Sequence, residues 1–163
     1  MGELGFVHLG QWGSGMPDWR DVVERDQLRL AGGLLVGGFL VLAIVTQFFH
    51  PSGDEDDHPV IFAEYARSDS WIAVHFLQTA GVLIALGGLV LLYHALELRG
   101  ELQVLARCAL VTTIAAAAIY AALQAVDGIT LKQAVDAWYN ASGAEQDDRF
   151  ADAETVRWIE WAL

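Results

Sequence analysis

Histidines and carboxylates are the residues of this chain whose types and spacing can support chemistry. His50 and His58 bracket the acidic stretch HPSGDEDDHP, and His75 follows in the next apolar segment. Imidazole and carboxylate together suit a divalent transition metal, whereas carboxylates alone suit calcium. The candidate metal ligands are His50, Asp54, Asp57 and His58.

The spacing within this acidic stretch matches no defined metal motif. It lacks the alternating ligands and terminal glutamate of an EF-hand, and the sequence contains no HExxH. A solvated acidic loop, whose His-Pro pairs end helices, is the alternative explanation. Both interpretations stay open from the sequence.

Two histidines from different helices at the same depth can also hold haem iron. His50 ends one apolar segment and His75 lies one turn inside the next. We therefore expect them to face each other near the outer surface of the membrane that these segments span. His50 and His75 are the candidate cofactor ligands. His94, at the opposite end of the same segment, has no obvious second histidine.

A structural role is the alternative for His75. With Gln78 and Thr79 it forms a polar stripe at helical spacing, inside a segment where polar groups are costly unless they are hydrogen-bonded. The expected hydrogen-bond partners lie on the third apolar segment and are Thr112, Thr113, Tyr120 and Gln124.

Three long apolar segments position these side chains. Residues 71–96 contain no Asp, Glu, Lys or Arg; at ~1.5 Å per helical residue they reach roughly 39 Å, more than the ~30 Å hydrocarbon core of a bilayer. Residues 30–49 are uncharged, and residues 102–126 carry only Arg107 near their start, where it can snorkel. The sequence predicts an all-α transmembrane bundle with three spans.

Small residues suggest how these spans pack. Gly33 and Gly37 are four residues apart, with Gly32 and Gly38 beside them, so this face should let another helix approach closely. General bundle packing and a dedicated dimer seam are both compatible with this pattern. The third span is rich in alanine, and we expect other helices to surround it.

The segments flanking the spans are more polar. We expect a tail over residues 1–16, an interfacial helix over residues 17–29, and a short helix lying on the membrane in the first loop. Asp127 and Gly128 should end the third span, and Thr130 should cap an amphipathic helix. Its apolar positions are Leu131, Ala134, Val135 and Trp138.

A last helical pattern begins near Phe150 and presents Trp158 and Trp161. We interpret it as the start of a possible fourth span. The chain thus divides into an N-terminal cytoplasmic part (1–29), a membrane bundle (30–126) and an extracytoplasmic part (127–163).

Positive charges predict the orientation, because cytoplasmic flanks of spans are enriched in Lys and Arg. Five such residues flank the spans on the side of the N-terminus and two on the other side. On the side of the N-terminus they are Arg20, Arg25, Arg29, Arg99 and Arg107, and on the other side they are Arg67 and Lys132. The N-terminus is therefore expected in the cytoplasm, with the acidic first loop outside.

Composition excludes several functional classes. The net charge of −12 argues against nucleic-acid binding, which needs clustered Lys and Arg. Cys108 is the single cysteine, so there is no internal disulfide and no cysteine-based metal site. GxSxG, phosphate-loop and GxGxxG patterns are absent, and we expect no enzyme.

The segments HPVIFAEYARSDSWIAVH, LQAVDGITLKQAVDAW and RFADAETVRWIEW give the chain a family resemblance. From about Arg29 onward it resembles a group of uncharacterised bacterial polytopic integral membrane proteins of the domain-of-unknown-function type. The resemblance implies a multi-pass helical bundle in the bacterial cytoplasmic membrane, with further spans after the last segment. It implies no activity, cofactor or site residue.

The first functional hypothesis is a non-enzymatic membrane protein, acting as an accessory subunit or as a binder of a small ligand near its outer face. The alternative is a membrane redox or metal-binding protein that holds haem or a divalent metal at the outer histidines. A transporter fragment is a third possibility. The expected partners are membrane lipids, a second copy of the chain or a larger membrane complex.

Overall fold

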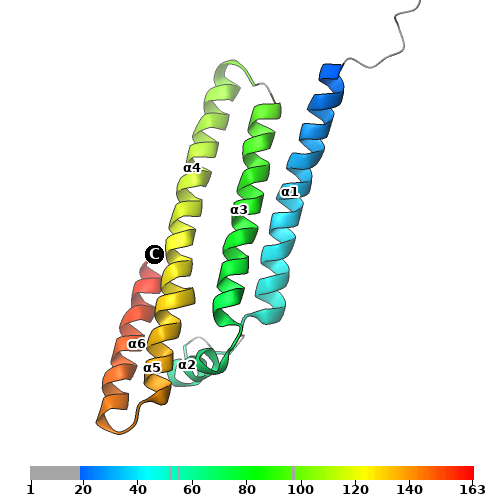
Figure 1. Ribbon diagram of the computed structural model, residues 1–163. Coiled ribbons are helices and arrows are strands. Elements are labelled where there is room, and N and C mark those ends of the chain that lie inside the picture. The colour runs from blue at the N-terminus through cyan, green and yellow to red at the C-terminus, as the bar shows by residue number, and fades with distance from the viewer. Residues whose placement is uncertain (1–18, 52, 55, 97) are drawn as a thin grey trace, which may run out of the picture.

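The computed structural model describes residues 19–51, 53–54, 56–96 and 98–163, and all regular elements in these ranges are helices (Figure 1). In chain order they are α1 (Trp19–Phe49), α2 (His58–Arg67), α3 (Trp71–Ala95), α4 (Gly100–Ala125), the π-helix η1 (Val126–Leu131), α5 (Lys132–Asn140) and α6 (Ala144–Ala162). The prediction of an all-α bundle is confirmed. The expected tail over residues 1–16 lies outside the described residues.

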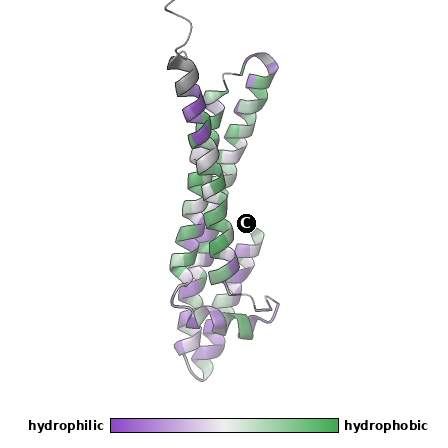
Figure 2. Cartoon of the chain, turned by 90° about the vertical axis from the view of Figure 1, so that its right-hand side faces the viewer, coloured by the Kyte–Doolittle hydropathy of each residue, from purple (hydrophilic) through white to green (hydrophobic). Residues whose placement is uncertain are grey.

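Three stretches are long and apolar enough to cross a membrane, as in an integral membrane protein. They are Glu24–Phe49, Trp71–Ala95 and Gly100–Asn140, the last of which runs through α4, η1 and α5. Figure 2 shows hydrophobic residues along the long helices, with hydrophilic ones at the start of α1 and in α2, α5 and α6. The C-terminal helix α6 is not among the candidate spans.

The N-terminal flank of the first span differs from the prediction. Residues from Trp19 onward belong to the same unbroken helix as the span, so no separate interfacial helix forms in the described part of residues 17–29 (Figure 1). The charged turns extend α1 along its own axis. The side chains of Arg29 and Asp26 are exposed there, and Nη1 of Arg29 lies 3.4 Å from Oδ1 of Asp26.

Helices α1 and α3 pack tightly against each other along their length. The buried positions of α1 lie seven residues apart, at Ala31, Gly38 and Val45. Six of the eight buried positions of α3 are spaced alternately by three and four residues, namely Trp71, Val74, Gln78, Gly81, Ala85 and Gly88; the other two are His75 and Ala95. This heptad spacing is typical of two helices that pack like a coiled coil.

Glycines allow the backbones of this pair to approach. A Cβ atom added at Gly38 would lie 2.4 Å from the carbonyl oxygen of Gly81, and one added at Gly88 would lie 2.7 Å from that of Ala31. Of the glycines predicted to let a helix approach, Gly38 makes the close contact, whereas no described atom lies within 4 Å of a Cβ added at Gly33 or Gly37. A dimer seam at those two positions stays a prediction. Glycine spacing indicated a close contact but not which face makes it.

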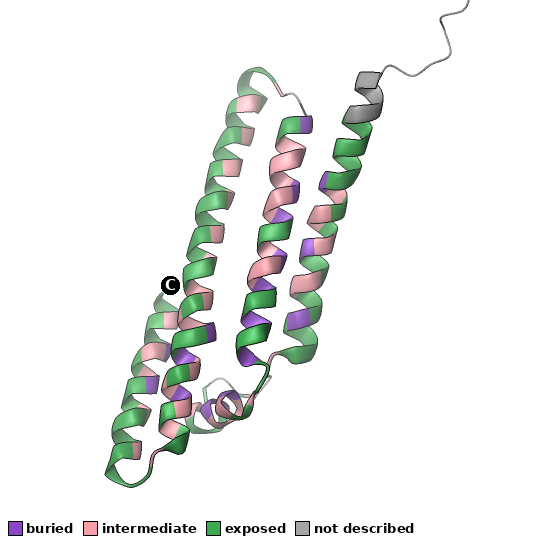
Figure 3. Ribbon diagram, viewed as in Figure 1, coloured by how far each residue is buried: buried purple, intermediate pink, exposed green. Residues whose placement is uncertain are grey.

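Helix α4 packs much more loosely. No residue of α4, all of which the structure describes, is buried, so its expected enclosure by other helices does not occur within this chain (Figure 3). Between α1, α3 and α4 lies an apolar groove of about 410 Å³, lined by residues such as Leu42, Val82 and Tyr120. The alanine-rich surface of α4 therefore faces outward.

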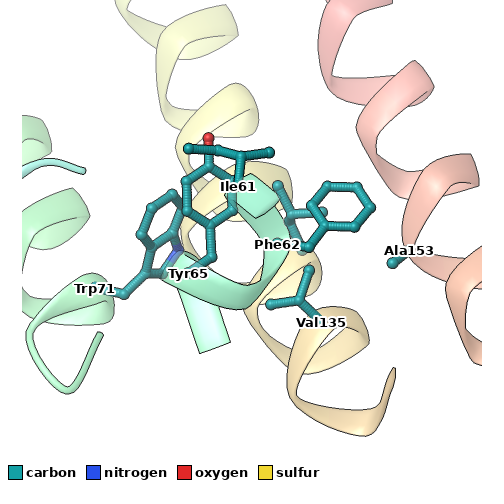
Figure 4. Packing of buried hydrophobic residues seen from close by; sticks show 7 residues of the cluster. Ile61, Phe62, Tyr65, Trp71, Val135 and Ala153 are labelled. Atoms are coloured by element: carbon teal, nitrogen blue, oxygen red, sulfur yellow. The ribbon is translucent and has the colours of Figure 1, made fainter. Parts of the chain in front are cut away.

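A compact aromatic core lies at the end of the bundle where α1 ends and α3 begins (Figure 4). It joins α2, the start of α3, η1, α5 and α6 through Ile61, Phe62, Tyr65, Trp71, Leu131, Val135 and Ala153. The predicted amphipathic pattern of α5 is confirmed, because Leu131 and Val135 are fully buried. Helix α2 was expected to lie on the membrane, but its apolar face is buried in this core instead.

Replacement of Gly38 by Leu tests the packing of α1 against α3. The new side chain would overlap the backbone at Gly81 and Ala85, and overpacking of this kind costs about 1–3 kcal/mol. Thermal unfolding of the purified protein in detergent measures the loss. Gly33→Leu is the matched control, and equal melting temperatures of the two variants would contradict this packing.

Candidate metal-binding site

One continuous helical stretch carries α4 out of the membrane segment and into α5. Asp127 and Gly128 do not end the helix as predicted, since they form part of the π-helix η1. The wider turn is stabilised by the Thr130 hydroxyl, which donates to the carbonyl of Ala125 at 3.3 Å. Thr130 is thus not a cap, and π-turns within α-helices frequently occur at functional sites.

Gly128 allows this π-turn to lie directly against α3. A Cβ atom at position 128 would lie 2.6 Å from Cβ and 2.8 Å from Cγ of His75. The neighbouring Asp127 is held by its backbone as well, because Trp71 donates its indole N–H to the Asp127 carbonyl at 3.2 Å. Glycine at position 128 therefore permits the contact between Asp127 and His75.

Both ring nitrogens of His75 face oxygen acceptors. Nδ1 lies 2.8 Å from the carbonyl oxygen of Trp71, and Nε2 lies 2.9 Å from Oδ2 of Asp127. The Trp71 carbonyl can only accept, so Nδ1 carries a proton. A second proton must then form the hydrogen bond between Nε2 and Oδ2 of Asp127, carried either by the imidazole or by the carboxyl group. A metal ion bound to both groups would take the place of this second proton.

His50 approaches the same point from the end of α1. Its Nδ1 lies 2.9 Å from the Pro51 carbonyl and donates to it, which leaves Nε2 with a lone pair. The His50 and His75 rings have centroids 5.5 Å apart. Both histidines thus have Nδ1 bonded to a backbone carbonyl, and such a bond commonly orients a metal-binding histidine.

The three side chains together form a possible metal site. One ligand atom from each of His50, His75 and Asp127 lies within 4.8 Å of the other two. The ligand atoms of one tetrahedral Zn²⁺ ion lie roughly 3.4 Å apart, so binding requires movements of up to roughly 1.4 Å. Oδ1 of Asp127 is buried and has no hydrogen-bond partner among the described residues. This is expected of an oxygen atom that binds an ion or a water molecule.

A small cavity of about 130 Å³ adjoins this site between α3 and α4. Its lining includes His75, Thr79 and Gln124. Oε1 of Gln124 is buried without a hydrogen-bond partner in the described part of the chain. A cavity of this size holds water, which can complete the coordination of an ion bound by three protein ligands.

The structure does not bring the four residues of the acidic stretch together. Asp57 caps α2 by accepting from the Val60 N–H, and Asp54 accepts from the Asp56 N–H. His58 lies 2.7 Å from Glu154 of α6. Of the sequence candidates, the structure thus joins His50 with His75, whereas His58 belongs to the contact between α2 and α6.

The polar stripe of α3 is hydrogen-bonded, but not to the predicted partners. Gln78 donates to the Thr46 hydroxyl of α1 at 2.9 Å, and Thr79 donates to the carbonyl of His75. The expected bonds from this stripe to Thr113 and to the other polar residues of the third span are not found in the described structure. Tight packing of α3 against α1 explains the difference, since it directs Gln78 away from α4.

The surroundings of the two histidines do not suit haem. A macrocycle held between His50 and His75 needs a wide empty plane, yet the Asp127 carboxylate lies within 4.8 Å of both ligand atoms. The Trp71 ring also packs on both histidines, with centroids 5.2 Å from His50 and 4.4 Å from His75. These contacts leave no plane for a macrocycle between the two histidines.

A second pair of opposite charges lies beside the site, in α6. Arg157 donates to both carboxylate oxygens of Glu160 at 3.0 and 2.7 Å. Burial alone would lower the pKa of the Arg157 guanidinium, but the Glu160 carboxylate outweighs this and raises the pKa above its ordinary value. Arg157 therefore remains a cation that neutralises Glu160.

Few features of the sequence indicate that Asp127 belongs to the site. It lies 52 residues after His75 and was interpreted as a helix-ending residue. The usable signal is its position: consecutive spans run in opposite directions, so a carboxylate directly after the third apolar segment lies at the same depth as a histidine one turn inside the second.

No family model, no curated protein and no solved structure matches this chain. The resemblance to bacterial polytopic membrane proteins stays a prediction. The functional argument therefore depends on the geometry of the site.

Replacement of Gly128 by Ala tests how the site is held. The added methyl group would overlap the His75 ring and push η1 away from α3, and we expect the free energy of unfolding to fall by about 1–3 kcal/mol. Thermal unfolding in detergent measures the effect. Gly87→Ala is the control, because no described atom lies within 4 Å of an added Cβ there. Unchanged stability of G128A would show that η1 does not lie against His75.

Proposed function

We propose that this chain is a non-enzymatic integral membrane protein that binds one divalent transition-metal ion at the outer end of its helix bundle. The observation that carries the proposal is the convergence of His50, which directly follows α1, with His75 of α3 and Asp127 of η1. Two imidazoles and one carboxylate suit ions such as Zn²⁺ or Co²⁺ better than calcium or magnesium. The unpartnered Oδ1 of Asp127 supports the same conclusion.

The same contacts argue against acid–base catalysis by His75. In hydrolases that pair histidine with a carboxylate, the second ring nitrogen faces the nucleophile and takes its proton. In His75 the ring nitrogen that does not face Asp127 is Nδ1, and it is hydrogen-bonded to the backbone carbonyl of Trp71. This arrangement supports a binding role, and it leaves His75 no nitrogen with which to activate a substrate.

We further propose that the protein lies in a bacterial cytoplasmic membrane, with its N-terminus in the cytoplasm and the metal site on the outer side. The distribution of Lys and Arg around the spans supports this orientation. Lipid acyl chains fill the apolar groove between α1, α3 and α4. The exposed surface of α4 remains available for a second copy or for another subunit of a membrane complex.

Metal titration tests the proposal directly. We expect the purified, chelator-treated protein in detergent to bind one Co²⁺ or Zn²⁺ ion, as measured by the visible absorption of Co²⁺ and by calorimetry with Zn²⁺. His50→Ala and Asp127→Ala should each weaken binding at least tenfold, which corresponds to about 1.4 kcal/mol. His50 is the sharper variant, because its only hydrogen bond in the described structure is to the adjacent Pro51.

Two other histidines provide the controls. His58 is bonded to Glu154, and His94 lies at the other end of α3, so H58A and H94A should bind the ion as the parent protein does. The proposal is wrong if the parent protein binds no ion, or if H50A and H58A bind it equally well.

Thiol labelling in intact cells tests the orientation. In a background with Cys108 replaced by Ala, we expect a membrane-impermeant maleimide to label Asp54→Cys and not Asp26→Cys. Both positions are exposed, and they flank opposite ends of α1. Labelling of both after the cells are opened provides the control, and the reverse pattern in intact cells would place the N-terminus outside.

A further inference from the structure

Helix α6 changes character along its length. Five carboxylates lie in its first eleven residues, and these are Glu145, Asp147, Asp148, Asp152 and Glu154. The charged residues after Glu154 are Arg157 and Glu160, which neutralise each other. We do not expect a helix that lies entirely in water to concentrate its carboxylates in its first part and leave its last turns apolar.

The apolar side chains of the last turns are exposed. Trp158 is 57% exposed, Ile159 50%, Trp161 44% and Leu163 55%. Trp158 and Trp161 form an edge-to-face pair with ring centroids 5.0 Å apart, and both also contact the His58 ring. These four residues, here called the α6 apolar tip, are each 44% or more exposed within the described part of the chain.

Helix lengths predict where this tip lies. The 15 residues of η1 and α5 rise about 22 Å from the end of α4, and the 19 residues of α6 return over about 28 Å. Because α6 packs antiparallel to α5, its last residues extend past the level at which η1 begins. Figures 1 and 2 agree, since the end of α6 lies level with part of α3 and α4.

Ring contacts connect the tip to the membrane end of α3. Trp71 begins that span, and its ring lies 4.1 Å from the ring of Tyr65. The Arg157 guanidinium lies 5.9 Å from the Tyr65 ring and 5.0 Å from the Trp161 ring. Trp161 is therefore separated from the start of α3 by only two side chains, and it lies near the depth of the bilayer surface.

We propose that the α6 apolar tip is immersed in the outer interfacial layer of the bilayer. Tryptophan rings favour this layer, because one part of the indole is apolar and its N–H is polar. The acidic first part of α6 then remains in water, and the helical hairpin of α5 and α6 leans back onto the lipid. This interaction is independent of the proposed metal site.

Fluorescence quenching at single cysteines tests the proposal. With Cys108 replaced by Ala, Ile159→Cys is labelled with bimane in phosphatidylcholine vesicles, and Asp148→Cys, exposed in the acidic part of α6, is the matched control. We expect lipids with a nitroxide near the headgroup to quench the label at position 159 at least twofold more than the label at position 148. Iodide in the outer solution should show the opposite preference.

Two results would overturn the proposal. Equal quenching by iodide at both positions would place the tip in water. Protection of position 159 from both quenchers, with a doubled mass in detergent, would show that a second copy of the chain covers it. Trp158→Cys gives an independent label should Ile159→Cys fail to fold.

Discussion

Contact between the backbones of α1 and α3 determines where the other parts of the structure lie. Gly38, Gly81 and Gly88 remove the side chains that would otherwise separate the two helices. The pair is antiparallel, so the end of α1 lies beside the start of α3. His50 consequently lies close to His75, although 21 residues, including α2, separate α1 from α3. In lipid, where apolar surface gains nothing from burial, such packing and the Gln78–Thr46 hydrogen bond are the main forces that hold the pair.

Around α2, α5 and α6 the packing differs, because these helices bury a compact cluster of apolar side chains. Aromatic and aliphatic side chains there form a core like that of a soluble protein, in which Phe62 and Leu131 are fully buried. Trp71 belongs to both parts, since it starts α3 and also packs on Tyr65 of the outer core. The outer helices are therefore attached to the α1–α3 pair through one aromatic residue and the adjoining π-turn.

Sequence reasoning succeeded where one local property decides the outcome. Three uncharged segments of at least 18 residues require helices in lipid, and the spacing of Leu131 and Val135 requires an amphipathic helix. Prediction from sequence failed where a contact depends on two segments that are distant in the chain. Four glycines lie on several faces of α1, and only the arrangement of Gly81 and Gly88 on α3 selects Gly38 over Gly33.

The candidate site shows the same division. His50 and His75 were predicted to meet because both lie near the outer ends of adjacent spans, and their depth follows from helix length alone. Asp127 was interpreted as a helix terminator because Asp-Gly pairs usually end helices. Its side chain faces His75 because the π-turn keeps the helix intact while Gly128 closes on the histidine ring. No local pattern distinguishes such a turn from an ordinary helix end.

These contacts also explain how the third span is held. Helix α4 has no buried residue along its described length, so within the bilayer little fixes it against α3. At its C-terminal end, the Asp127 carbonyl accepts one hydrogen bond from the Trp71 indole, the Asp127 carboxylate pairs with His75, and α5 is anchored in the aromatic core. An ion that binds His50, His75 and Asp127 together necessarily stabilises the arrangement in which α4 lies beside the α1–α3 pair, since binding to one conformation shifts the equilibrium toward it. The proposed ion binding would therefore be thermodynamically linked to the position of the third span.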